Sequence, residues 1–95
     1  MKSDTSKIEQ EYLKKLTDRI VYLRKEKKVS QETLANDSSI ARSLMRGYER
    51  GERNISFANL IRIIKVGLDM KVEDFFSEGF DKDAKESKAK SSEKD

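Results

Sequence analysis

Apolar residues recur along the first third of the chain at intervals that fit one face of an α-helix. They are separated by four, four, four and three positions: Ile8, Tyr12, Leu16, Ile20 and Leu23. This spacing is close to the 3.6-residue period of a helix. The stripe predicts an amphipathic helix from about residue 7 to 27, with Lys27 and Lys28 at the end where the helix dipole favours cations.

Four shorter helices are predicted after this one. Ser30 is a good N-cap for a helix over 31–36, and turn-forming residues at 36–39 separate it from a helix over 41–50 that ends at Gly51. Ser56 caps a fourth helix that stops at Gly67, and apolar residues predict a short fifth: Val72, Phe75 and Phe76. No stretch alternates with period two. The pattern predicts an all-α fold, a compact five-helix bundle.

The two ends of the chain differ from the middle. The segment 81–95 has Ala84 and Ala89 as its only apolar residues, which is too little apolar surface to offset the entropy of ordering it. We therefore predict a flexible N-terminus over 1–6, one folded domain over 7–80 and a disordered charged tail over 81–95.

The composition excludes several classes of function. The chain has no cysteine and no histidine, so it lacks the usual ligands of a structural zinc site and the commonest general acid–base group. It also has no apolar run of the ~20 residues that a membrane span needs. We expect no metal, no cofactor, no membrane association and no enzymatic activity, and a reducing cytoplasm suits a chain without cysteine.

Charge is concentrated in the middle of the chain. Residues 19–54 hold nine Lys or Arg and five Asp or Glu, net +4, whereas the whole chain is only +3. This distribution indicates an anionic partner for the middle segment. A solvated basic face without a partner is the alternative.

The predicted 41–50 helix divides into two faces. One carries Ala41, Leu44, Met45 and Tyr48, and the other carries Arg42, Ser43, Arg46, Gly47 and Arg50. Arginine matches guanine O6 and N7 bidentately and also pairs with phosphate, so the polar face is suited to the major groove of DNA. Gly47 costs about 1 kcal/mol relative to alanine. It either lets the helix backbone approach DNA or is an accident of a marginal helix.

The segment SQETLANDSSIARSLMRGYERGERNIS resembles the Cro/phage-repressor (XRE) helix-turn-helix family. Ser30-Gln31 opens the first helix of the motif, Ala35 sits where its two helices cross, and the motif closes with Glu49-Arg50-Gly51. Large apolar residues occupy the family positions at Ile40, Met45 and Tyr48. The resemblance covers roughly residues 16–76 and implies a repressor-like DNA-binding domain.

A narrower stretch, RSLMRGYERGERNISFANL, is similar to the controller proteins of restriction–modification systems. They tend to have glycine at the place of Gly47 and Arg-Asn after Glu-Arg-Gly, as in Arg53-Asn54 here. General XRE regulators share much of this pattern.

The resemblance implies a role for each matching residue. Arg42, Ser43 and Arg46 would face base edges, with Gly47 beside them. Gln31 would contact phosphate or an adjacent base. The residues that would grip phosphate from the end of the helix and its loop are Arg50, Arg53 and Asn54. Arg24 and Glu49 match an internal ion pair of some family members, although two separate surface charges are equally compatible with the sequence.

Two positions depart from the family pattern. The turn of the motif usually contains glycine with positive φ, and this chain has Ser39. Serine tolerates the left-handed region less well, so we expect a strained or altered turn. The family often has proline before its fourth helix, where this chain has Ile55.

Family members usually bind DNA as dimers, with two recognition helices about 34 Å apart. Apolar residues that exceed the needs of the core are candidates for this contact: Ile63, Val66, Met70, Phe75, Phe76 and Phe80. Each of them can instead complete the core, which is the preferred interpretation for Phe75.

Two functions are compatible with these observations. The first is a sequence-specific DNA-binding transcription regulator that binds double-stranded DNA at a palindromic operator as a homodimer. The alternative is an antitoxin or adaptor module that uses the same fold to bind a protein partner, with the segment before residue 16 or the tail after residue 80 as the extra binding element.

Overall fold

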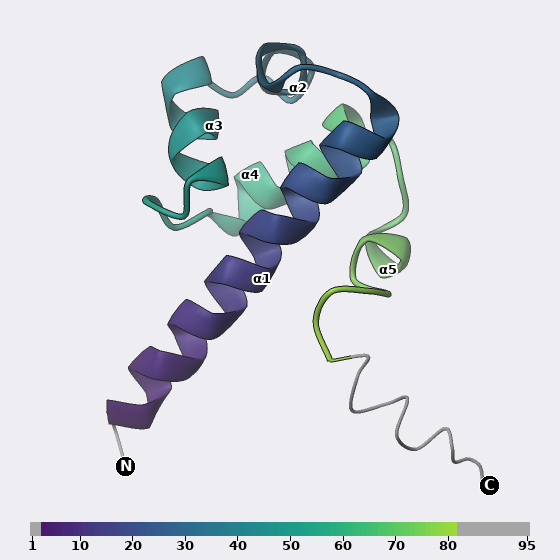
Figure 1. The fold of residues 1–95 in the computed structure, drawn as a ribbon. Helices are drawn as coiled ribbons and strands as arrows, with labels where there is room; N and C mark the ends of the chain where they lie inside the picture. The colour runs from purple at the N-terminus through teal and green to yellow at the C-terminus, as the bar shows by residue number, and fades with distance from the viewer. Residues whose placement is uncertain (1–2, 82–95) are drawn as a thin grey trace, which may run out of the picture.

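The computed structural model describes residues 3–81, which form five helices and no strand (Figure 1). The elements are α1 (Ser3–Lys27), α2 (Gln31–Asp37), α3 (Arg42–Glu49), α4 (Phe57–Ile61), a π-helical continuation η1 (Arg62–Gly67) and α5 (Val72–Phe75). The all-α, five-helix prediction is confirmed, and each predicted helix lies within a few residues of its expected place. The predicted tail beyond Asp81 lies outside the described residues.

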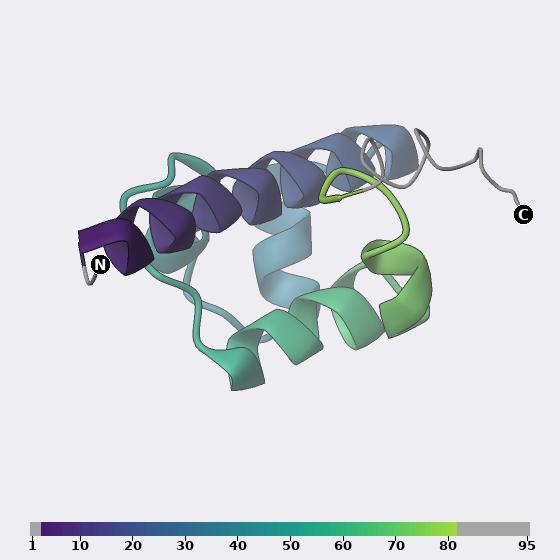
Figure 2. The ribbon, with the colours of Figure 1, turned by 90° about the horizontal axis from the view of Figure 1, so that it is seen from below.

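Helix α1 is longer than predicted. It begins at Ser3 instead of residue 7, so residues 3–6, which were expected to precede the helix, are part of it. Its first turns project beyond the other helices (Figures 1 and 2). Residues 5–11 are all exposed, and Ile8 keeps 55% of its surface in solvent. The apolar stripe is therefore continuous along α1, but only its C-terminal part has other elements to pack against.

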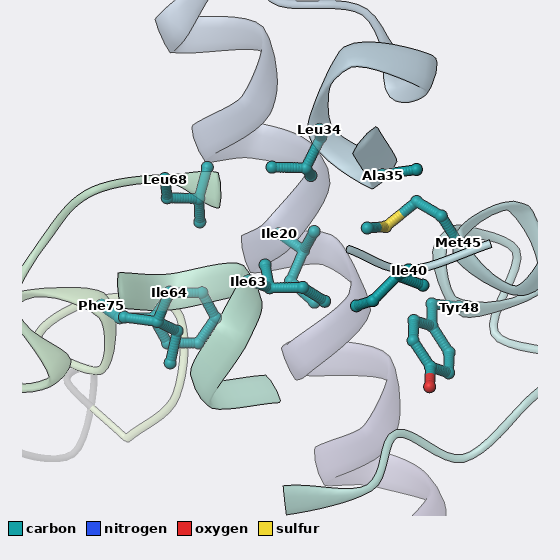
Figure 3. Packing of buried hydrophobic residues seen from close by; sticks show 10 residues of the cluster. All are labelled: Ile20, Leu34, Ala35, Ile40, Met45, Tyr48, Ile63, Ile64, Leu68 and Phe75. Carbon is teal, nitrogen blue, oxygen red and sulfur yellow. The ribbon is translucent and has the colours of Figure 1, made fainter. Parts of the chain in front are cut away.

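The core is one cluster to which the C-terminal half of α1, α2, α3, η1 and α5 contribute, and Leu60 of α4 packs against it (Figure 3). Ile20 of α1 lies in its middle, between Phe75 and Ile64 on one side and Met45 and Tyr48 on the other. The full cluster is Ile20, Leu34, Ala35, Ile40, Met45, Tyr48, Ile63, Ile64, Leu68 and Phe75. Since α2 and α3 share this core with α1 and η1, the helix-turn-helix is held rigidly against the rest of the domain.

Two polar groups of α1, the buried Arg19 and the partly exposed Lys15, attach other elements to it. Arg19, whose side chain is 8% exposed, donates from Nε to the Phe75 carbonyl at 2.7 Å and from Nη2 to the Asp74 carbonyl at 2.9 Å. Carbonyls at the end of a helix have no partner within it, so this arginine satisfies the last turn of α5. Helix α1 also holds the segment after α5, because Lys15 Nζ donates to the Phe80 carbonyl at 2.8 Å.

Gly67 permits the close packing of α2 on η1. A Cβ at this position would lie 2.2 Å from Ser38 Oγ and 2.7 Å from Leu34 Cδ1, both buried in α2 or at its end. The helix does end at Gly67, as predicted, but the left-handed residue that follows is Asp69, with φ of 53°. The reason for glycine here is therefore a helix–helix contact and not a helix stop.

The turn between α2 and α3 adopts the conformation for which the family uses glycine. Ser39 has φ of 59°, in the left-handed region, and its carbonyl accepts a hydrogen bond from Arg62 Nη1 at 3.5 Å. Ser39 thus adopts the strained backbone conformation expected from the sequence, and the helices on either side of it are regular. At the second position that differs from the family pattern, Ile55 stands where the family often has proline, and it packs against the core.

We expect Ser39→Gly to stabilise the fold by roughly 0.5–1 kcal/mol. Left-handed backbone costs a non-glycine residue about 1–2 kcal/mol, and glycine returns about 0.4–1 kcal/mol of this through its freer unfolded chain. Urea unfolding monitored by circular dichroism measures the difference. Asn36→Gly in the neighbouring helix is the control, because glycine there should lower stability. If Ser39→Gly destabilises the fold, the backbone at Ser39 is not strained.

Candidate nucleic-acid interface

Helices α2 and α3 form the two arms of a helix-turn-helix. The N-cap Ser30 accepts a hydrogen bond through Oγ from the Thr33 backbone N–H at 3.0 Å, which fixes the start of α2. Ala35 is fully buried beside Met45 where the two helices meet, and its carbonyl accepts from the Ile40 N–H at 2.9 Å. A small residue at the crossing and a short hydrogen-bonded turn set the angle at which α3 is presented.

Helix α3 has one buried and one exposed face, as its sequence predicts, except that Ala41 is exposed and Gly47 is buried. Met45 and Tyr48 are buried, with exposed fractions of 0% and 2%. The three predicted base readers, Arg42, Ser43 and Arg46, are exposed on this helix. The structure therefore brings these readers together on the solvent side of a single rigid element.

Hydrogen bonds to Tyr48 fix α3 from two sides. Thr17 of α1 donates through Oγ1 to the Tyr48 carbonyl at 3.0 Å, and Asn59 of α4 donates through Nδ2 to the Tyr48 hydroxyl at 2.8 Å. Thr17 is itself buried. Sequence reasoning missed both donors, because neither belongs to the helix-turn-helix segment. The apolar neighbours of Thr17 along α1, at Leu16 and Ile20, are the only hint that it faces the core.

The predicted partners Arg24 and Glu49 form a bidentate ion pair. Arg24 donates from Nε to Glu49 Oε2 at 2.7 Å and from Nη2 to Oε1 at 3.0 Å. The side chains are 14% and 6% exposed, and Arg24 also donates from Nη1 to the Val29 carbonyl at 3.0 Å. The Glu49 carboxylate thus faces α1 at the end of α3 and is neutralised by the arginine.

Gln31 belongs to the same network. Its Nε2 donates to Glu49 Oε1 at 2.9 Å, which joins the start of α2 to the end of α3. An amide nitrogen has two N–H donors, so one remains for the phosphate that the resemblance assigns to this residue. The structure thus adds a fold-stabilising role that the sequence did not suggest.

Gly47 does not lie open to DNA, contrary to the prediction. It is buried, and a Cβ at this position would lie 2.6 Å from Arg53 Cγ. The chain turns back after α3 at Gly51, with φ of 75°, and the Glu52 N–H donates to the Gly47 carbonyl at 2.9 Å. The aliphatic stem of Arg53 then crosses directly over Gly47. The glycine therefore makes room for an arginine side chain, and the expected approach of the helix backbone to DNA at this point is wrong.

The remaining predicted phosphate contacts surround the end of α3. Arg50, Arg53 and Asn54 are all exposed. Arg50 and Asn54 line a depression of about 580 Å³ between this end of α3 and α1, together with Lys14 and Asp18. Arg53 instead lies over α3 itself, with its aliphatic stem against Gly47.

Among the described residues, an acidic group contacts the basic face at one place. Arg42 Nη1 lies 2.7 Å from Oε2 of Glu32 in the first turn of α2, with the two side chains 57% and 59% exposed. Within residues 3–81, Arg46, Arg50 and Arg53 make no ion pair. The acidic partner of Arg42 was not predicted, because the contact depends on the angle between α2 and α3.

The candidate dimer residues fall into three groups. Ile63 is fully buried, so its assignment to a dimer contact is wrong; it completes the core, as does Phe75. Met70 and Phe80 are half-buried against the core. Val66 and Phe76 remain, 60% and 42% exposed.

Phe76 lines an apolar groove of about 560 Å³ between α1, α4 and the segment after α5. Its other apolar walls include Leu16, Leu60 and Phe80, and Tyr12 closes it through a hydrogen bond to Asp81. A surface of this kind fits a partner that buries apolar side chains.

Residues 3–81 contain no cluster of acidic, histidine or cysteine side chains that could hold a metal ion. No helix in this range is both long and apolar enough to cross a membrane.

A short helix, a tight turn and a second helix with an exposed arginine face define a helix-turn-helix protein. The family described as helix-turn-helix matches residues 20–66. The chain belongs to this family, of the XRE type, and its structural relatives include restriction–modification controller proteins.

Three solved structures illustrate the similarity. A point mutant of the controller protein C.Esp1396I has 33% sequence identity, covers 77% of this chain and 94% of its own, and superposes with a TM-score of 0.70. The C.Esp1396I tetramer in complex with its natural 35 base-pair operator has 37% identity, covers 68% and 84%, and gives a TM-score of 0.65. C.AhdI from Aeromonas hydrophila has 41% identity, covers 67% and 96%, and gives a TM-score of 0.62. A comparison with curated proteins gave no match.

Proposed function

We propose that this protein is a sequence-specific DNA-binding transcription regulator of the restriction–modification controller type. It binds double-stranded DNA with α3 in the major groove. The division of α3 carries the proposal: arginine and serine cover its exposed face, while its buried face is fixed through Met45 and Tyr48. The similarity to controller proteins, one of them solved with its operator, supports the same function.

The proposed contacts separate into two kinds. Arg42, Ser43 and Arg46 read base edges, because they lie on the solvent side of the helix that enters the groove. The residues that hold phosphates are Gln31, Arg50, Arg53 and Asn54. Phosphate contacts set affinity and register, and base contacts set sequence preference.

A homodimer completes the proposal. One helix-turn-helix makes few contacts, and two copies related by a two-fold axis place their α3 helices about 34 Å apart, on successive major grooves. The groove at Phe76 and the exposed Val66 are the surfaces offered for this contact. Such a dimer requires a palindromic operator.

This function needs neither catalysis nor a cofactor, and it places the protein with the DNA in the cytoplasm. The similarity to DNA-binding regulators supports a regulator and not an enzyme. No contact among residues 3–81 specifically favours the alternative, an antitoxin or adaptor.

Selection of binding sites from a random DNA pool tests the proposal. We expect enrichment of a palindrome whose half-site centres are about one helical turn, or a multiple of it, apart. Adjacent methyltransferase and nuclease genes would identify a controller. Failure to enrich any sequence, with the folded protein confirmed by circular dichroism, would contradict it.

Gly47→Ala is expected to weaken DNA binding by displacing Arg53, although alanine adds about 1 kcal/mol of helix propensity. The new Cβ would overlap Arg53 Cγ, so the arginine must rotate away from α3. If its phosphate contact is lost, the slope of log affinity against log salt falls by about 0.9. Titrations of duplex DNA over a range of salt measure both quantities.

Arg53→Ala should reproduce this loss, and adding Gly47→Ala to it should change binding little, since both act on one side chain. Independent, additive losses would show that Gly47 acts elsewhere. A gain in affinity on Gly47→Ala alone would show that Arg53 makes no useful contact from its position over the helix.

A further inference from the structure

Glu32 places one carboxylate at the edge of the basic face of α3. Its Oε2 lies 2.7 Å from Nη1 of Arg42, the first residue of that helix. The other arginines of this face have no acidic partner within residues 3–81. Arg42 is therefore held differently from Arg46, although both are proposed base readers.

The pair contributes little to folding. Both side chains are more than half exposed, and exposed pairs of this kind add little to stability. In addition, an acidic residue in the first turn of a helix is favourable without any arginine nearby. The consequence of the contact lies in what Arg42 can do when DNA arrives.

Resting on the function proposed above, we propose that Glu32 sets the discrimination between operator and random DNA by controlling Arg42. A guanidinium has five N–H donors, and the pair with Glu32 engages Nη1. The donors on Nη2 and Nε remain for guanine O6 and N7, so Arg42 can read a base while it stays paired. Glu32 then orients the arginine towards the groove.

Binding to random DNA depends on different chemistry. It is almost entirely the neutralisation of phosphates by cations, with release of their counterions. Glu32 offsets the charge of Arg42 and repels a phosphate that approaches the same edge of α3. The carboxylate therefore lowers affinity for random DNA and spares the operator, where the base contact is made.

The test compares the wild-type full chain with Glu32→Gln, which keeps the size of the side chain and removes its charge. Glu73→Gln is the matched control: it changes the net charge equally at an exposed position of α5, which lies across α1 from α3 (Figure 1). Fluorescence anisotropy measures the Kd for the selected palindrome and for a random duplex over a range of salt. Thermal unfolding shows that both variants are folded.

We expect Glu32→Gln to bind the random duplex about two to five times more tightly, with a salt slope steeper by about 0.9. Its affinity for the palindrome should stay the same or fall, so the ratio of the two affinities decreases. The Glu73→Gln control should match the wild type. If Glu32→Gln gains the same affinity for both duplexes, Glu32 only repels DNA in general, and the proposal is overturned. The proposal is also overturned if Glu32→Gln binds both duplexes as the Glu73→Gln control does. If the wild type itself prefers no sequence, the proposed function fails instead, which is a distinct result.

Discussion

Replacing Glu49 with alanine is expected to lower the free energy of unfolding by about 3 kcal/mol. The change leaves the Arg24 guanidinium, 14% exposed, without its carboxylate, and it removes the acceptor of the Gln31 amide. Breaking a buried ion pair from one side costs about 3–5 kcal/mol. We expect the lower end, because Arg24 keeps its hydrogen bond to the Val29 carbonyl. Urea unfolding followed by circular dichroism gives the value.

An exposed ion pair provides the control. Asp18 pairs with Lys14 at 3.1 Å, with the two side chains 63% and 76% exposed, so Asp18→Ala should change stability by less than about 0.5 kcal/mol. If Glu49→Ala costs no more than Asp18→Ala, the buried pair does not stabilise the fold. A domain of this size has only about 5–15 kcal/mol in total, so the difference is easily measured.

The pair also explains an acidic residue at the end of a DNA-facing helix. Glu49 is the last residue of α3, and its two carboxylate oxygens are taken up by Arg24 and Gln31. The carboxylate is therefore directed away from solvent and towards α1. The same contacts fix the end of α3 relative to α1 and α2, which keeps the exposed arginines in one orientation.

The sequence predicts the helices and the division of α3 because both depend on local periodicity. The apolar stripe of α1 and the two opposite faces of α3 follow from the 3.6-residue repeat. Caps at Ser30 and Ser56 accept the expected backbone hydrogen bonds. Within the candidate site, the exposure of Arg42, Ser43 and Arg46 follows from the same periodicity.

The features that the sequence did not predict depend on tertiary geometry. Gly47 faces Arg53 because the chain turns back at Gly51, and nothing in the helix pattern shows where a later side chain will lie. Ile63 and Val66 both look like surplus apolar residues, yet the π-helical turn of η1 buries the first and exposes the second. The contact between Glu32 and Arg42 likewise requires the angle between two helices.

Arg46→Ala is expected to weaken binding to the selected palindrome by about 1–3 kcal/mol and to relax the preference at one base pair. Arg46 lies in the middle of α3, on its exposed face. It makes no ion pair within residues 3–81. Its whole guanidinium is thus available to one guanine. Competition titrations against palindromes substituted at each position measure the loss and locate the base.

Arg53→Ala distinguishes a base reader from a phosphate contact. It should weaken all duplexes alike and flatten the salt dependence, whereas the loss for Arg46→Ala should be much larger on the palindrome than on random DNA. Position within the exposed face supports this difference, since Arg46 projects from the helix itself and Arg53 reaches over it from the loop. Equal losses for the two variants on every duplex would show that Arg46 holds phosphate, and base recognition would then rest on Arg42 and Ser43.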